Sequence, residues 1–437
     1  MNIWAWIGLS GIVVFTLLAF LRKEHRTNEK IREAFITIAI VLAIIITVLL
    51  FNVDYILAFL LGVIAYILLD KKTYTKKRLI IYGGMIIVIG TAFFVIFRDN
   101  PDYVLDHLQD NPETTSLYVV KNGEEIIAYQ SDIVRPLAST VKIMIALEYA
   151  MQVEAGALDK TQPVPLDELS RFFYEGTDGN AHETWLESIH AAGKVKDAQV
   201  PLHEVAKGMI TYSSNANTDY LLHLLGTSAI NEQIESVGLT HHEPVYPLVS
   251  PLLFPEYIAD DSMNKEDTIK ELEAIPMERY RELAVNLSKQ LKEGTIDIND
   301  HSFDLPLEVQ KVWSDRLTRA SAKDYGQLLS IISNDELPAE AAAIMRDLME
   351  WPMEMNEANQ DYYAHIGSKG GSTAFILNDA LYAEDLEGDR IEIVLFTDNL
   401  NLWQSLMLQN SINSFEVNLI GDEAYRLKVK QTLEEQS

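Results

Sequence analysis

The chain has 437 residues, which is too long for one ordinary domain and allows a membrane unit together with one large soluble unit. It contains no cysteine, which removes disulfides, thiol catalysis and thiolate metal sites. Its 35 Lys+Arg against 64 Asp+Glu give a formal net charge of -29, which argues against nucleic acid as a partner.

Four nearly uncharged apolar runs fill the first 98 residues. They occupy residues 3–21, 35–51, 55–69 and 79–97. Two of them reach nineteen residues, which is long enough for a helix to cross a bilayer. Lys and Arg cluster in the connections after the first and third runs, and such loops face the cytoplasm. The sequence therefore predicts a four-span plasma-membrane anchor over 1–98, with the N-terminus and everything after Arg98 outside.

The charge balance changes at the same boundary. Through Arg98 the chain carries 11 Lys+Arg against 5 Asp+Glu, and the remainder carries 24 against 59, a balance of -35. Residues 99–115 are polar and turn-prone, which predicts a stalk. Residues 116–437 then form the predicted extracytoplasmic domain.

Strand patterns stand at both ends of that domain, and helical patterns lie between them. The predicted strands form two hairpins, one from 116–120 and 125–129 and the other from 372–383 and 391–397. The predicted helices lie at 202–212, 218–225, 277–291, 322–332 and 340–350, with a closing amphipathic helix at 400–419. This order indicates an α+β domain in which distant segments complete one antiparallel sheet around an inserted helical lobe.

A Ser-x-x-Lys tetrad opens a strongly helical apolar run at 135–150. Pro136 forbids a helix upstream, and Ser139 suits an N-cap or first-turn position. Ser139 and Lys142 then share one helix face, where a half-buried lysine can lose its proton and activate the hydroxyl. The same spacing at Ser262 and Lys265 lies in an acidic polar stretch without apolar flanks, which indicates a solvated loop.

Two further motifs follow the tetrad along the chain. Ser213 and Asn215 stand in a polar connection between two predicted helices, and Lys369, Gly370 and Gly371 lead into a predicted strand. In this order the segments resemble the Ser-x-x-Lys, Ser-x-Asn and Lys-[Ser/Thr]-Gly signatures of class A β-lactamases and penicillin-binding proteins. The resemblance covers about 116–419, including the hairpin before Ser139 and the closing helix. It implies a β-lactamase/transpeptidase-like α/β fold and a serine hydrolase without a cofactor.

The resemblance also implies a role for each matching residue. Ser139 is the expected acylated nucleophile, and Lys142 is its base or the partner of its base. Ser213 is expected to relay a proton to the leaving nitrogen, beside Lys369, and Asn215 is expected to hold the substrate amide. The expected oxyanion hole consists of the backbone amides of Ser139 and Ser372, with Gly370 and Gly371 on the substrate-binding strand.

The chain departs from the family pattern at two places. Gly370 stands where a Ser or Thr hydroxyl helps to bind the substrate carboxylate. The Glu-x-x-Leu-Asn loop, whose Glu activates the deacylating water in class A enzymes, is missing after the second motif. Glu243 and Glu256 stand in roughly the right order but are interpreted as ordinary loop acids. A long-lived acyl-enzyme follows, which favours a peptidase or a sensor over an efficient lactamase.

The expected function is therefore acyl-enzyme hydrolysis of β-lactams or of cell-wall D-Ala-type peptides at the outer membrane face. Two alternatives remain open. One is a β-lactam sensor that signals through its membrane helices, and the other is a non-catalytic wall-binding scaffold. The neighbouring His241, His242 and Glu243 lack a second ligand pair at zinc-site spacing, so no metal site is predicted.

Overall fold

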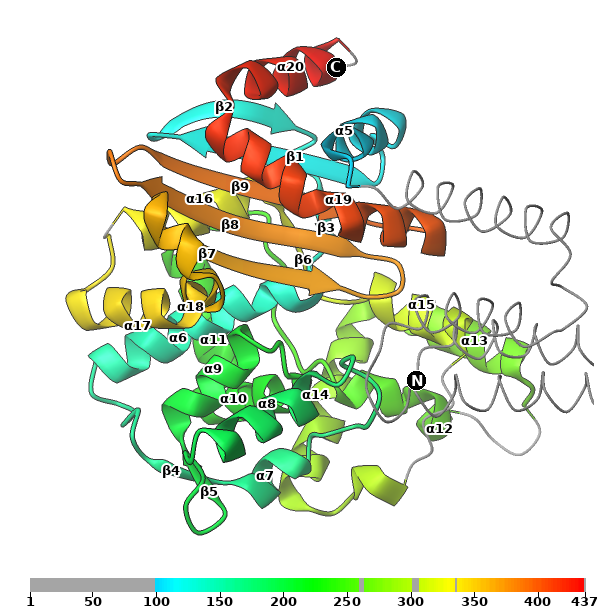
Figure 1. Ribbon diagram of the computed structural model, residues 1–437. Helices are drawn as coiled ribbons and strands as arrows, with labels where there is room; N and C mark the ends of the chain where they lie inside the picture. Colours follow the sequence, from blue (N-terminus) through cyan, green and yellow to red (C-terminus); the bar gives the residue numbers. More distant parts are fainter. Residues whose placement is uncertain (1–98, 259–262, 301–305, 335, 436–437) are drawn as a thin grey trace, which may run out of the picture. The chain divides into compact units, whose positions relative to one another are not determined.

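The computed structural model describes residues 99–258, 263–300, 306–334 and 336–435 (Figure 1). The four predicted spans lie outside these residues. No helix in the described ranges has both the length and the apolar character that crossing a bilayer requires.

A five-stranded antiparallel sheet organises the domain that begins at Asp99. Its strands are β1 (Thr115–Lys121), β2 (Glu124–Tyr129), β7 (Tyr363–Ser372), β8 (Leu377–Asp385) and β9 (Arg390–Thr397). Their order is β2-β1-β9-β8-β7, so β1 from the start of the domain pairs with β9 from its end. β7 is an edge strand.

The sheet separates two apolar cores because side chains alternate between its faces. Leu117 and Val119 of β1 pack under α5 (Pro101–Asp110), α19 (Leu402–Gly421) and α20 (Glu423–Glu434). Tyr118 and Val120 point to the opposite face, towards α6 (Lys142–Glu154), α16 (Ala322–Ser333) and α17 (Ala339–Met349). Figure 1 shows α19 lying across the sheet on the first of these faces.

A helical lobe is inserted between β2 and β7. Its helices are α7 (Leu166–Ser170), α8 (Ala181–Ala191), α9 (Leu202–Ile210), α10 (Asn215–Leu225), α11 (Thr227–Ser236), α12 (Phe254–Ile258), α13 (Lys265–Ala274), α14 (Met277–Glu293) and α15 (Leu307–Asp315). Part of the lobe has a core of its own, in which Phe254 packs edge-on against Tyr280. Short α18 (Trp351–Met355) precedes β7. Two small ribbons, β3 (Val134–Pro136) with β6 (Arg319–Ser321) and β4 (Pro163–Pro165) with β5 (Gln199–Pro201), complete the strands.

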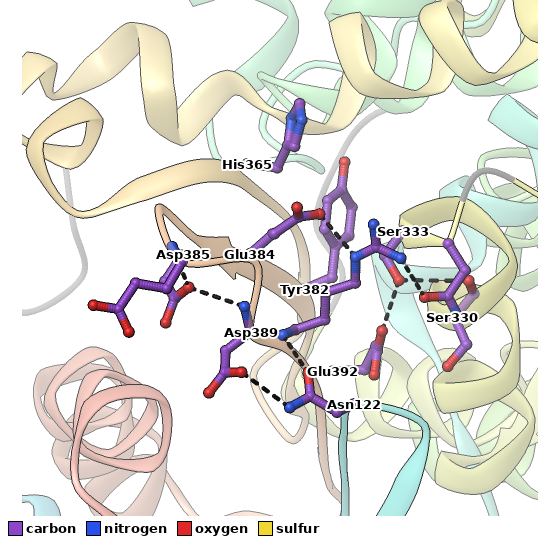
Figure 2. Close-up of polar contacts among 12 residues, drawn as sticks. Asn122, Ser330, Ser333, His365, Tyr382, Glu384, Asp385, Asp389 and Glu392 are labelled. Atoms are coloured by element: carbon purple, nitrogen blue, oxygen red, sulfur yellow. Dashed lines mark hydrogen bonds and ion pairs between the residues drawn. The ribbon is translucent and has the colours of Figure 1, made fainter.

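A polar network fixes the end of the sheet at the β8–β9 turn (Figure 2). Arg390 donates to Glu384 at 2.8 Å, and Asn122 of the β1–β2 turn donates to Asp389 at 3.1 Å. Behind them, Ser333 of α16 donates to the buried Glu392 at 2.6 Å. These bonds join two hairpin turns that are distant in sequence, and they lie at the end of β8 far from Ser372 of β7.

The predicted architecture agrees with the structure in its main elements. Both hairpins are present, although the strand expected at 372–383 is β8, which begins at Leu377. The third motif lies inside β7, a strand that the sequence pattern did not separate from the turn after it. The five helices predicted between the hairpins are present, with shifted ends, as α9, α10, α14, α16 and α17. Helices α7, α8, α11, α12, α13, α15, α18 and α20 were not predicted.

Residues 99–115 and the closing helix α19 differ from what the sequence predicted. Residues 99–115, expected as a stalk, contain α5, which Asn100 caps and whose Val104, Leu105 and Leu108 are buried. Apolar residues one turn apart outweigh the polar composition here. The closing helix, expected to be amphipathic, presents Leu402 and Leu406 on its outward face.

Candidate active site

Ser139 lies in a 3-10 turn, Ala138–Val141, between β3 and α6. Of the two positions expected for Ser139, the first-turn position holds, because Ser139 lies in the 3-10 turn that leads into α6 at Lys142, and the N-cap residues are Leu137 and Val141. Ala138 adopts a φ of 47°, a left-handed conformation that is strained for a residue with a Cβ. The turn is therefore held in place by its surroundings and leaves the Ser139 side chain half-buried.

Lys142 is fully buried at the start of α6. Its Nζ lies 2.6 Å from the Ser213 carbonyl oxygen, 2.9 Å from Asn215 Oδ1 and 3.2 Å from Ser213 Oγ. Burial, and secondly the charge of Lys369, hold the pKa of Lys142 well below its usual value. A lysine of this kind is a suitable proton acceptor. In the described part of the chain no hydrogen bond joins it to the Ser139 hydroxyl, so proton transfer requires Lys142 to exchange a partner when substrate binds.

The Ser213 hydroxyl lies between two lysines. Lys369 Nζ donates to Ser213 Oγ at 3.0 Å and to the Gly370 carbonyl at 2.7 Å. Burial lowers the pKa of Lys369 to about 8. Ser213 itself has a φ of 69°, which again is strained backbone for a non-glycine residue. The contacts from Lys142 and Lys369 thus connect all three predicted motifs through one hydroxyl.

Asp178, just before α8, and His182, in the first turn of α8, contact the second motif. Ser214 caps α10, and His182 Nδ1 lies 2.9 Å from its Oγ. Burial lowers the pKa of His182 to about 4, so the ring is neutral and packs as a core residue against Trp185. Asp178 accepts hydrogen bonds from the backbone of Asn215 at 3.4 Å and of His182 at 3.2 Å. Asp178 and His182 therefore position the strained Ser213 loop.

Gly371 allows β7 to approach the nucleophile turn. A Cβ added at Gly371 would lie 2.8 Å from the Ser139 backbone nitrogen and 2.6 Å from the Leu137 carbonyl oxygen. Real Cβ atoms essentially never come this close to backbone, so only glycine fits. The approach brings the Ser139 turn beside Ser372. The backbone amides of Ser139 and Ser372 are the two groups expected to form the oxyanion hole.

A cavity of about 350 Å³ lies over this arrangement. Its lining comes from both the sheet and the lobe: Ala138, Ser139, Thr177, Asp178, Gly179, Ser213, Asn215, Leu248, Gln310, Trp313, Leu317, Lys369, Gly370, Ser372, Thr373 and Ala374. Thr177 to Gly179 lie in the connection between α7 and α8. The structure thus gathers the predicted site residues at one cavity. Behind the lining, Lys142 bonds to Ser213 and Asn215, and Gly371 approaches the Ser139 turn.

The lobe wall of the cavity presents apolar side chains and one carboxylate. After α11 the chain passes the cavity with Leu248, whose N–H donates to Asp219 at 2.9 Å. Glu243 instead pairs with Arg281 at 2.7 Å, and neither it nor Glu256 lines the cavity. Among the described lining residues the one carboxylate is Asp178, and backbone N–H groups occupy it.

Other predicted features lie elsewhere. Ser262, the second Ser-x-x-Lys serine, is outside the described residues. His242 Nδ1 contacts the Glu243 carbonyl at 2.7 Å, and His241 lies near Asp324. Within the described ranges, no cluster of three or more His, Asp or Glu side chains is arranged to hold a metal.

Sequence reasoning missed several residues of the cavity wall. Asp219, which is buried behind this wall and accepts the N–H of Leu248, stands one helical turn after Asn215, a spacing that signals a shared helix face. Nothing in the sequence near Leu248 or Trp313 indicates that they reach the same cavity, because their positions depend on side-chain bonds across the lobe. Trp313 Nε1, for example, donates to the Leu248 carbonyl at 3.1 Å.

Comparison with known proteins gives one family and a set of similar folds. A model of the Beta-lactamase enzyme family matches residues 102–426. No curated protein matches the chain. Similar solved structures include a beta-lactamase from Sphaerobacter thermophilus DSM 20745, with 17% identity, 73% of this chain and 95% of that chain covered, and a TM-score of 0.46. A beta-lactamase from Chitinophaga pinensis DSM 2588 has 14% identity, coverage of 73% and 99%, and a TM-score of 0.44. PBP-A has 18% identity, coverage of 72% and 94%, and a TM-score of 0.42.

Proposed function

The chain belongs to the beta-lactamase enzyme family and is a serine hydrolase of that family, and from this premise we propose how it acts and where. It is a membrane-attached, extracytoplasmic enzyme that transfers the acyl group of a β-lactam or of a D-Ala-type cell-wall peptide to Ser139. The observation that carries the proposal is the contact of Lys142 and Lys369 with one hydroxyl, that of Ser213, beside Ser139.

Acylation follows from these contacts. Neutral Lys142 takes the proton of the Ser139 hydroxyl as Oγ bonds to the substrate carbonyl carbon. The backbone N–H groups of Ser139 and Ser372 stabilise the oxyanion that forms. The C–N bond then breaks, and the leaving nitrogen receives the Ser213 proton, which Lys142 replaces across 3.2 Å. The product is an ester of Ser139.

The charge of the cavity supports an anionic substrate. Lys369 lies at the cavity wall, and its ammonium keeps a positive charge near Ser213 below a pH of about 8. A β-lactam and a peptide that ends in D-Ala both carry a carboxylate near the amide that is attacked. Gly370 offers no hydroxyl to this carboxylate, so Lys369, Ser213 and Thr373 provide the polar contacts.

Release of the acyl group is the slow step in this proposal. Leu248 occupies the lobe wall, and the Asp178 carboxylate already accepts backbone hydrogen bonds. No described lining residue is therefore free to act as a strong base on water, the role that the family pattern gives to a glutamate. We accordingly assign a peptidase-like reaction with a persistent acyl-enzyme in preference to efficient lactam hydrolysis.

Membrane attachment rests on the sequence of residues 1–98. Its four apolar runs and its basic connections support a multi-pass anchor that leaves the domain from Asp99 onward outside the cell. The proposal places the enzyme at the outer face of the plasma membrane, where cell-wall peptides are present.

The test is covalent labelling of the full chain in membranes. Fluorescent penicillin is added, and intact mass is followed over time for the wild type and for Ser139→Ala. We expect one acyl adduct that persists in the wild type and is absent from the variant. Ser262→Ala, which has the same Ser-x-x-Lys spacing, should label as the wild type does. Absence of both adduct and lactam hydrolysis in the wild type refutes the substrate class, whereas rapid turnover refutes the slow release.

A further inference from the structure

The outward face of α19 is apolar although it lies on the surface of the domain. Leu402 is 49% exposed, Leu406 43% and Val417 56%, and the Trp403 side chain is 51% exposed. The first three lie at helical spacing along one side of the helix. Exposed apolar side chains that gather in this way mark a surface that contacts something other than water.

This helix also carries no exposed charge. Glu416 is the sole ionisable residue between Leu402 and Gly421, and it is buried against the sheet. The outward polar residues are amides and serine, among them Gln409 and Asn413. The chain after Arg98 has a charge balance of -35, so twenty consecutive residues without an exposed charge are unusual in this domain.

The start of the domain is attached to the same helix. The backbone N–H of Asn100 donates to Ser411 Oγ at 3.3 Å, and Ser414 donates to the Asp99 carboxylate. The 98 residues before this point contain the four apolar runs. The first residues after the apolar N-terminal sequence, Asp99 and Asn100, are therefore bonded to α19.

We propose that α19 lies in the lipid–water interface of the membrane and contacts it through Leu402, Trp403, Leu406 and Val417. The inference rests on the membrane attachment proposed above. A tryptophan at the helix start suits the headgroup region, where its apolar ring and polar N–H both find partners. The uncharged face fits zwitterionic lipid, because the acidic domain around it repels an anionic surface. At 1.5 Å per residue, the helix lies along roughly 30 Å of that surface.

The contact of α19 with the membrane also sets the position of the active-site cavity relative to the bilayer surface. The backbone N–H of Leu400, just before α19, donates to the Phe375 carbonyl at 2.9 Å. Phe375 follows Thr373 and Ala374, which line the cavity. Docking of α19 therefore holds the β7–β8 side of the active site close to the bilayer surface.

Depth-dependent fluorescence quenching tests the proposal. Because the chain has no cysteine, Asn413→Cys on the outward face of α19 gives one labelling site, and Glu187→Cys on exposed α8 gives a matched control. The full chain is labelled with a nitrobenzoxadiazole dye and reconstituted into phosphatidylcholine vesicles that contain lipid with a nitroxide headgroup. We expect several-fold stronger quenching at position 413 than at position 187. Adding Leu402→Gln and Leu406→Gln should reduce the quenching at 413, whereas Leu386→Gln, at the distant β8–β9 turn, should not.

The outcomes separate this inference from the proposed function. The inference is overturned if quenching is equal at the two positions in chains that float with the vesicles and are acylated by penicillin. The proposed function would stand in that case. Disulfide-linked dimers of the unlabelled Asn413→Cys chain, together with weak quenching of the labelled chain, show that a second copy covers α19 and also overturn it. A chain that does not float with vesicles overturns both membrane attachment and the contact.

Discussion

The two walls of the cavity differ in what they present to a substrate. The sheet wall brings Ser139, Ser372 and Lys369 together through a backbone approach that only Gly371 permits. The lobe wall presents Leu248 and Trp313, and its one described carboxylate, Asp178, is already bonded to backbone. The contacts of Lys142 and Lys369 with Ser213 that we propose for forming the acyl-enzyme are present without substrate, whereas the described lining offers no unengaged carboxylate for hydrolysing it. Because Ser213 comes from the lobe, the proposed acylation draws on both walls, and the second half-reaction can be lost while the first is kept.

Removing the proposed base, Lys142, should have the largest effect on acylation. Lys142→Met keeps the length and the burial of the side chain but cannot take a proton. We expect the rate of acylation by penicillin to fall by about 100- to 10,000-fold, the usual contribution of a general base. Intact-mass kinetics measure the rate, and a thermal melt checks folding. Acylation within a few-fold of wild type in a folded variant would assign proton removal to another group.

Displacing the edge strand should cost nearly as much. In Gly371→Ala the new methyl group meets the Ser139 backbone nitrogen at 2.8 Å, which forces β7 away from the nucleophile turn. A displacement of this size lowers acylation by about 100-fold. Gly421→Ala serves as the control, because a Cβ there meets open space. Equal acylation rates in the two variants would contradict the close approach.

Supplying a base on the lobe wall should speed the release of the acyl group. Leu248→Glu places a carboxylate at the cavity, and we expect deacylation to accelerate by about tenfold or more. Leu248→Gln has the same size without the base and should release the acyl group at the wild-type rate. The decay of the penicilloyl adduct by intact mass gives both rates. If Leu248→Gln accelerates release as much as Leu248→Glu does, release in the wild type is slow because the apolar wall excludes water. A missing base would then not be the cause.

The pH dependence of acylation should report the two lysines. Burial lowers the pKa of Lys369 to about 8, so its ammonium is lost as pH rises through 8 and the rate should fall there. On the acid side the rate should rise with pH as Lys142 loses its proton, because its pKa lies well below the usual lysine value. Acylation rates from about pH 5 to pH 10 give the profile. A rate that keeps rising above pH 9 would exclude a role for the Lys369 charge.

Restoring the missing hydroxyl should have the smallest effect. A Cβ at Gly370 meets the Asn378 carbonyl oxygen at 3.5 Å, an ordinary contact, so Gly370→Thr should fold. One added hydrogen bond to the substrate carboxylate improves the apparent affinity for penicillin by about 2- to 10-fold. Gly370→Val has the same shape without the hydroxyl and should show no gain. Competition against fluorescent penicillin measures the difference.

The sequence located the motif residues because each motif is local. Ser139 with Lys142, and Ser213 with Asn215, are two or three residues apart, so spacing alone brings them together, and the order of the motifs suggested Lys369. The position of Leu248 was not predictable, because it depends on a bond to Asp219, 29 residues away.

The fold was predictable to the same extent and for the same reason. Alternating apolar residues identified the hairpins, and helical spacing identified the lobe. The strand character of 363–372 was hidden by three glycines, which have low strand propensity but are held in β7 by pairing with β8. Helix α5 was missed because the polar residues of 99–115 suggested a stalk, while burial against α19 determines its structure.

The pairing of β1 with β9 has a consequence for the order in which the domain assembles. Tyr118 lies opposite Val394, so the centre of the sheet joins segments more than 270 residues apart in sequence. Such long-range pairing is slow to form, and it must wait until nearly all of the domain has left the ribosome. Until then β1 and β2 form a lone hairpin, and the edge of β1 that later pairs with β9 is unpaired. A chaperone that meets the emerging chain is therefore expected to bind this hairpin longer than any part of the helical lobe.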